Sequence, residues 1–93
     1  MGVMAKKVPF NKTGIGKLPD DKPVVYHIKT PGGKTNYIGS AQRGRVQERL
    51  QDHLGKIPGG NVQIQQFGNI NEARRSEQRA IARTQPKHNK QGK

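Results

Sequence analysis

The chain has 93 residues, of which 18 are Lys or Arg and six are Asp or Glu, giving a net charge of +12, and only 29% are hydrophobic. A chain this short is expected to form one domain with a thin core. The absence of cysteine excludes a disulfide framework, a thiolate zinc site and a catalytic thiol. No apolar run reaches the ~20 residues of a membrane span, and the first ten residues lack the apolar core of a secretory signal. We therefore expect a cytoplasmic protein with no membrane partner, and the charge predicts nucleic acid as its partner.

The first predicted elements are two strands joined by a tight turn. Residues 24–28 (VVYHI) are β-branched or aromatic at nearly every position, and alternate residues, Tyr26 among them, share one face. The sequence TPGG at 30–33 is typical of a turn. Residues 36–39 (NYIG) resume the strand pattern, so the segment from 24 to 39 is predicted to be a β-hairpin.

A helix is predicted next, from about Arg43 to Leu54. Val46, Leu50 and Leu54 are spaced at i, i+4 and i+8, and Gly55 follows as a plausible end of the helix.

A third strand and a second helix complete the pattern. After a loop at 58–60, residues 62–67 alternate well enough for a short strand. Asn71 is then predicted to cap a helix reaching roughly to Arg83, before Pro86 stops it. The predicted order is β-β-α-β-α, a small three-stranded sheet flanked by helices in the α/β (α+β) class.

Charge is spread unevenly along the chain and suggests its organisation. Residues 74–93 carry seven basic groups against a single acid, which is half of the net charge. We predict that residues 1–22 form a basic, partly flexible N-terminal extension, residues 23–89 form the domain, and residues 90–93 form a flexible basic tail.

One acidic residue interrupts the apolar face of the second predicted helix. Glu77 shares that face with Ala73, Ala80 and Ile81. Burying an ionised carboxylate is costly unless it is paired or binds a metal. Helix geometry offers Arg74, three residues earlier, as an ion-pair partner, and a metal is the alternative.

The first predicted helix carries a second candidate constellation. Arg49 and His53 are one turn apart and border the apolar stripe, so an anion could bind between them. A solvated helix face is the ordinary alternative for such a pair.

The order of these residues resembles the GIY-YIG nuclease family over residues 23–89. The family's first tripeptide has a counterpart ending in Tyr26, with Val24 where the family usually has Gly. Ten residues separate it from the second tripeptide, which is present literally. An Arg-x-x-x-His helix, a Glu helix and a closing Pro-x-x-Asn follow in the family's order. The matching segments are Pro23-Val24-Val25-Tyr26, Tyr37-Ile38-Gly39, Arg49 to His53, Ala73 to Glu77, and Pro86 to Asn89.

The resemblance implies a metal-dependent endonuclease that hydrolyses phosphodiester bonds with one metal ion, in DNA rather than RNA. Glu77 would then bind one Mg²⁺ or Mn²⁺, which keeps several waters. Arg49 would hold a phosphate oxygen, and Tyr37 would orient the water or the phosphate. Either Tyr26, whose unperturbed pKa near 10 is an objection, or His53 would act as the general base.

Further residues are predicted to bind substrate. Gly39 would allow backbone and substrate to approach closely, or would form a tight bend. Asn89 would hold the geometry of the site. The predicted substrate-binding set is Gly39, Ser40, Arg43, Arg45, Lys87 and Asn89, where Ser40 stands in place of a different polar or basic residue in many family members.

Two other functions are compatible with the sequence. A small basic nucleic-acid-binding protein without catalysis fits the composition equally well, and the set of Tyr, Arg, His and Glu residues is what separates it from a nuclease. The second is a nuclease toxin or effector domain. Such a domain would be delivered outside the cell and inhibited by a partner protein. The oligomeric state is left open.

Overall fold

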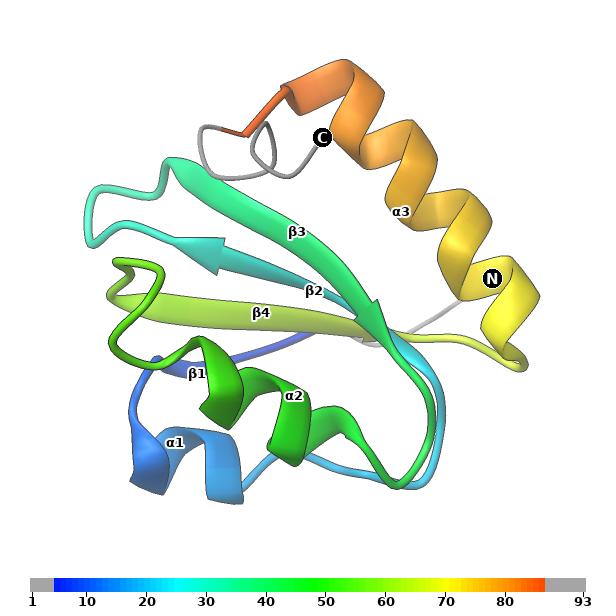
Figure 1. Cartoon of the computed structure of the whole chain (residues 1–93), viewed down its shortest axis with the longest axis horizontal. Helices are drawn as coiled ribbons and strands as arrows, with labels where there is room; N and C mark the ends of the chain where they lie inside the picture. Colours follow the sequence, from blue (N-terminus) through cyan, green and yellow to red (C-terminus); the bar gives the residue numbers. More distant parts are fainter. Residues whose placement is uncertain (1–4, 87–93) are drawn as a thin grey trace.

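The computed structural model describes residues 5–86 and shows one antiparallel sheet with helices on both of its faces (Figure 1). The sheet contains β1 (Ala5–Pro9), β2 (Val24–Lys29), β3 (Thr35–Ala41) and β4 (Asn61–Gln66). The helices are α1 (Lys12–Gly16), α2 (Val46–His53) and α3 (Ile70–Thr84). The strand order is β1-β4-β2-β3, so β3 is an edge strand. None of the helices in the described range is long and apolar enough to cross a membrane.

The mixed α+β class is confirmed, but the predicted three strands in the order β-β-α-β-α are wrong. The order is β-α-β-β-α-β-α, because the predicted N-terminal extension contributes β1 and α1. Strand β1 pairs with β4, with Val8 opposite Val62. Ile15 and Leu18, in and after α1, are buried in the core. The segment AKKVP contains two lysines and places a single large apolar side chain, Val8, in this core, too little for a periodic signal.

The predicted hairpin is confirmed, and each of its strands is slightly longer than the sequence indicated. Helix α2 begins later than predicted, at Val46, because Gly44 has a φ of +83°, which ordinary side chains rarely adopt. The residue at its N-cap makes no side-chain cap; instead the backbone N–H of Val46 donates to Asp20 Oδ1 at 2.8 Å. Gly55, also with a φ of +83°, follows its end as predicted.

Helix α3 begins slightly earlier than predicted and is capped by Asn69 rather than Asn71. The side chain of Asn69 accepts a hydrogen bond of 2.9 Å from the backbone N–H of Glu72. The helix ends at Thr84. Its C-cap residue Gln85 has a left-handed backbone conformation, and the buried Pro86 follows.

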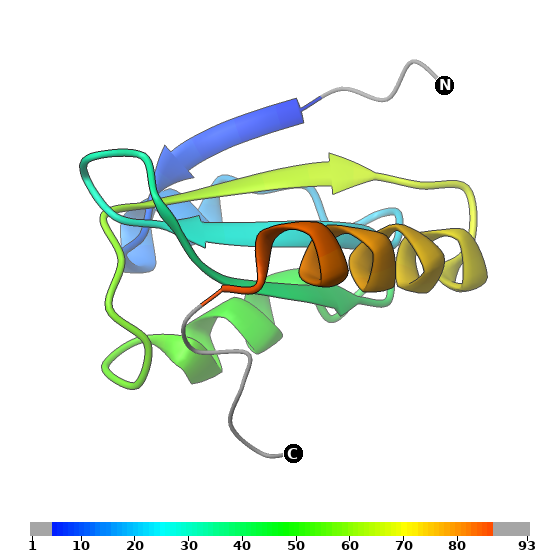
Figure 2. The same cartoon turned by 90° about the horizontal axis from the view of Figure 1, so that it is seen from above.

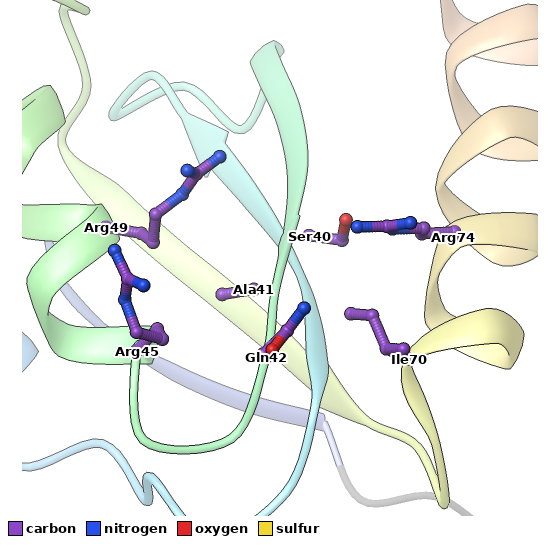
Figure 3. A pocket seen from close by; sticks show the side chains of 7 residues that line it. All are labelled: Ser40, Ala41, Gln42, Arg45, Arg49, Ile70 and Arg74. Atoms are coloured by element: carbon purple, nitrogen blue, oxygen red, sulfur yellow. The ribbon is translucent and has the colours of Figure 1, made fainter.

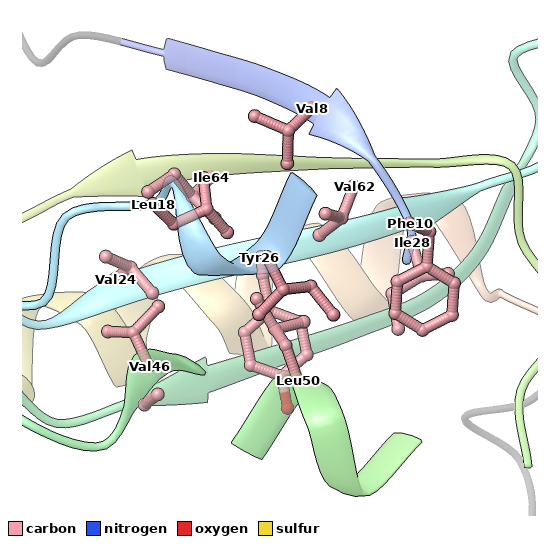
Figure 4. Close-up of a cluster of buried hydrophobic side chains, with 12 residues drawn as sticks. Val8, Phe10, Leu18, Val24, Tyr26, Ile28, Val46, Leu50, Val62 and Ile64 are labelled. Carbon is pink, nitrogen blue, oxygen red and sulfur yellow. The ribbon is translucent and has the colours of Figure 1, made fainter. Parts of the chain in front are cut away.

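Side chains alternate along β2 and so contribute to two separate hydrophobic cores, one on each face of the sheet. Val24, Tyr26 and Ile28 point to the side of α1 and α2, where they pack with Leu50 and the apolar residues of β1 and β4 (Figure 4). Val25 points to the opposite side, where it packs with Ile38 of β3 and the alanines of α3. Helix α3 lies over β2 and β3 and leaves the same face of β4 and β1 uncovered (Figure 2).

Candidate active site

Tyr26 lies at the centre of the candidate site and is completely buried beneath α2. It pairs across the sheet with Gly39 of the edge strand. A Cβ atom at Gly39 would lie 2.6 Å from both Cζ and the hydroxyl oxygen of Tyr26. Gly39, predicted to admit substrate or to form a bend, therefore lies inside a regular strand and makes room for the Tyr26 ring. The ring crosses β3, and its hydroxyl reaches His53.

Three rings form a cluster on this side of β3. The hydroxyl of Tyr26 is 2.9 Å from Nε2 of His53. The ring of Tyr37 stacks on Tyr26 with centroids 6.1 Å apart, and it lies 4.8 Å from the ring of His53. Tyr37 and His53 are half-buried. The structure thus brings together three of the predicted catalytic side chains, which come from β2, β3 and the end of α2.

Arg49 joins this cluster from one turn earlier in α2. Its side chain is exposed, and its guanidinium lowers the pKa of Tyr26 through both its charge and a hydrogen bond. Arg49 and His53, which were predicted to border one anion site, therefore both lie beside the buried Tyr26. A guanidinium in this place can bind the non-bridging oxygens of a phosphate.

The local environment shifts the pKa values of the Tyr26 phenol and the His53 imidazole in opposite directions. Burial raises the pKa of Tyr26 well above its ordinary value, Tyr37 adds to this, and Arg49 opposes it. Burial also lowers the pKa of His53 below 6.5, and the nearby charge of Arg49 lowers it further. Near pH 7 the site therefore holds a protonated phenol against a neutral imidazole whose Nε2 can accept the phenol's proton.

Glu77 reaches the same edge strand from the opposite face of the sheet. The hydroxyl of Ser40 donates a hydrogen bond of 2.7 Å to Oε1 of Glu77. Burial raises the pKa of Tyr37, and the negative charge of Glu77 raises it further and adds a smaller part to the raised pKa of Tyr26, so the carboxylate lies within electrostatic range of the ring cluster. The site therefore straddles β3, with the rings and Arg49 on one side and Glu77 on the other.

The alternative of an ion pair within α3 is wrong. No Lys, Arg or His nitrogen among residues 5–86 lies within 4.0 Å of the Glu77 carboxylate, and Arg74 instead faces an open hollow. Within residues 5–86, the half-buried carboxylate thus has Ser40 as a hydrogen-bond partner on Oε1 and no ion-pair partner.

A hollow of about 190 Å³ opens beside these residues at the end of β3 (Figure 3). Arg49 of α2 and Arg45 at the N-cap of that helix border it on one side, and Arg74 and Ile70 of α3 border it on the other. Its floor is formed by Ser40, Ala41 and Gln42. Sequence reasoning did not single out Gln42 as a lining residue and considered Arg74, by itself, as an ion-pair partner for Glu77. The spacing of Arg74 and Glu77 on one flank of α3 was the available signal.

The carboxylate fits a divalent ion that is held mainly by water and substrate. No group of three or more His, Cys, Asp and Glu side chains suited to a metal ion occurs in the described part of the chain. A single carboxylate with one oxygen fixed by Ser40 suits Mg²⁺ or Mn²⁺, since Mg²⁺ retains most of its waters and is often bound by one or two carboxylates.

The remaining predicted residues are distributed differently. Arg45 lines the hollow, although it also pairs with Glu48 at 3.1 Å in a solvent-exposed ion pair. Arg43 is exposed and does not line the hollow. Lys87 and Asn89 lie outside the described residues.

Tyrosine, histidine, arginine and glutamate side chains from β2, β3, α2 and α3 thus gather around the edge strand of an antiparallel sheet, and Arg49 among them also lines the hollow. Comparison with solved structures identifies this fold. The chain is similar to the GIY-YIG N-terminal endonuclease domain of UvrC from Thermotoga maritima bound to magnesium, at 27% identity and a TM-score of 0.63. The match covers 78% of this chain and 92% of that domain.

A point mutant of the same Thermotoga maritima domain, bound to its catalytic divalent cation, matches at the same identity and TM-score over 91% of its length. Neither the protein-family models nor the curated proteins gave a significant match. The chain has the GIY-YIG fold, as the order of its residues predicted.

Proposed function

We propose that this protein is a metal-dependent endonuclease that hydrolyses phosphodiester bonds in DNA. The observation that carries the proposal is the meeting of Tyr26, Tyr37, Arg49, His53 and Glu77, from four separate elements, around the edge strand β3. The similar UvrC domain is an endonuclease domain with bound magnesium, which supports both the reaction class and the metal.

Glu77 is the proposed ligand of the ion. A divalent ion bound there supplies positive charge to the oxygen that leaves phosphorus. The hydrogen bond from Ser40, which itself lines the hollow, fixes one carboxylate oxygen and so orients the carboxylate for the ion. Arg49, on the opposite wall, binds a non-bridging phosphate oxygen and neutralises the charge that grows there in the transition state.

Tyr26 and His53 together provide the general base. The raised pKa of Tyr26 makes a free phenolate scarce near pH 7, so the phenol cannot act alone. As the water oxygen bonds to phosphorus, its proton passes to the Tyr26 oxygen while the phenol's proton passes to Nε2 of His53 over 2.9 Å. The bond from phosphorus to the leaving oxygen then breaks. Tyr37 packs on both rings and holds them in place.

The decisive experiment is a cleavage assay on supercoiled, linear and branched DNA and on RNA, with Mg²⁺, Mn²⁺ or a chelator. We expect nicking or cutting of DNA that requires the metal. Glu77→Gln should abolish cleavage but retain DNA binding, whereas Glu72→Gln, which changes an exposed carboxylate on the same helix, should leave cleavage unchanged. Binding without cleavage of any substrate would instead support the small basic binding protein.

A further inference from the structure

The sheet has a second polar surface that the proposed active site does not use. Helix α3 lies over β2 and β3, and no helix within residues 5–86 lies over the same face of β4 and β1 (Figure 2). The strand register places Lys7, Gln63 and His27 side by side in one row across β1, β4 and β2. The next row contains Pro9, Asn61 and Lys29. We call this surface, formed by Lys7, Pro9, His27, Lys29, Asn61, Gln63 and Gln65, the open face.

The chemistry of the open face differs from that of a protein interface. Its strand residues carry two ammonium groups, three side-chain amides and one imidazole, with no carboxylate and no aromatic hydrocarbon ring among them. Burial and the charge of Lys29 lower the pKa of His27, so the imidazole is neutral near pH 7 and its positive neighbours are the lysines. Protein interfaces normally have an apolar centre. A surface of cations and amides suits a row of phosphates instead.

The open face is also hollowed. A depression of about 240 Å³ is lined by His27, Lys29 and three consecutive residues of β4, 63–65. Because the open face has no Phe, Tyr or Trp ring for base stacking, contacts here would go mainly to the sugar and phosphate groups and would be independent of sequence.

Helix α3 separates the open face from the active site and carries cations on both flanks. Arg74 lines the catalytic hollow. At 100° per residue, Arg83 lies half a turn from Arg74 and therefore on the flank of α3 that faces away from that hollow. Arg79 lies near Arg83 on this flank. Glu72 is on this flank too, near the start of the helix. Both Arg79 and Arg83 are exposed, so the second half of α3 extends the positive charge of the open face.

We propose that the open face binds the phosphate backbone of a second segment of nucleic acid, separate from the segment at the catalytic hollow. This proposal concerns binding alone. The open face could fail to bind DNA in a protein that is a nuclease, and it could bind DNA in a protein that has no nuclease activity. It implies two contact regions on a molecule measuring about 30 × 28 × 23 Å, one on each flank of α3.

The test is DNA affinity as a function of salt, measured without divalent metal to prevent cleavage. The double variant Lys7→Gln/Lys29→Gln removes two charges from the open face. The matched control Lys12→Gln/Lys17→Gln removes two charges at α1, on the other side of the sheet. Because each phosphate contact contributes about 0.9 to the slope of log K against log salt, we expect the open-face variant to lose about 1.8 and to bind at least about tenfold more weakly at 0.1 M salt. The control variant should change the salt slope and the affinity at 0.1 M salt by only a small fraction of the changes in the open-face variant.

A second measurement locates the contact. In NMR titrations of the wild-type protein with a short duplex, the side-chain amides of Gln63 and Gln65 and the ring of His27 should shift, and these shifts should saturate with binding. Equal losses in the two double variants would show that only net charge matters and would overturn the proposal. Unchanged signals on β4, or a change of oligomeric state in the open-face variant alone, would overturn it as well.

Discussion

Replacing Gly39 with alanine tests whether this glycine serves Tyr26. The new Cβ would lie 2.6 Å from Cζ and the hydroxyl oxygen of Tyr26 and 2.9 Å from Cε1. Non-bonded carbon atoms rest about 3.5–4.0 Å apart, so the ring or the strand must move by about 1 Å. Tyr26 is fully buried and β3 is hydrogen-bonded to β2, so neither can move freely.

Two effects should follow from that displacement. Overpacking of a buried site costs about 1–3 kcal/mol in the free energy of unfolding, which urea titration measures. A misplacement of about 1 Å at a reacting group costs about 10²-fold in rate, and steady-state DNA cleavage measures it. Gly16→Ala is the matched control, since no atom lies within 4 Å of its new Cβ, and this variant should be as stable and active as the wild type.

The Tyr26→Phe background separates two roles for Gly39. If Gly39 acts by placing the Tyr26 hydroxyl, adding Gly39→Ala to Tyr26→Phe should reduce the rate little further, because the hydroxyl is already gone. If Gly39 instead contacts the substrate, the two losses in activation free energy should add. Wild-type stability and rate in the single variant Gly39→Ala would refute the steric reasoning altogether.

Three further predictions concern the imidazole of His53, the carboxylate of Glu77 and the N-cap of α3. Burial and the charge of Arg49 lower the pKa of His53 most, and Lys56 adds a smaller lowering, so Lys56→Gln should raise that pKa slightly, which NMR titration of the ring should show. Because the base form of His53 is required, the acidic limb of the cleavage rate should move to higher pH. Ser40→Ala frees the Glu77 carboxylate from its 2.7 Å hydrogen bond, so the rise in Tm caused by Mn²⁺ should shrink, and an unchanged rise would contradict the positioning role. Asn69→Ala should lower the free energy of unfolding by about 1 kcal/mol in urea titration, with DNA affinity unchanged.

The parts of the fold that could be predicted from the sequence are those with a periodic apolar signal. Residues 24–39 form the hairpin because β-branched residues alternate on both sides of a glycine turn, and α2 and α3 follow from apolar stripes. Strand β1 could not be predicted because Val8 is its only large apolar side chain in the core, and α1 contains two glycines, which are poor helix formers.

The residues of the candidate site could be named from the sequence, but their contacts could not. Tyr26 and His53 are 27 residues apart, and their hydrogen bond depends on the position of α2 over the sheet. Asp20 helps to set that position by accepting from the first turn of α2, a contact across a loop that no local pattern reveals. Likewise, the partner of Glu77 is Ser40, 37 residues away, and not the arginine nearby in its own helix.

The walls of the catalytic hollow belong to helices on opposite faces of one sheet, and this fixes how a substrate can enter. Narrowing the gap between α2 and α3 would require bending β3, which is hydrogen-bonded along its length to β2. We therefore expect the gap between α2 and α3 to keep its width when a substrate binds. The nucleic acid has to supply the deformation, so branched, nicked or frayed DNA should be cut faster than a straight duplex of the same sequence.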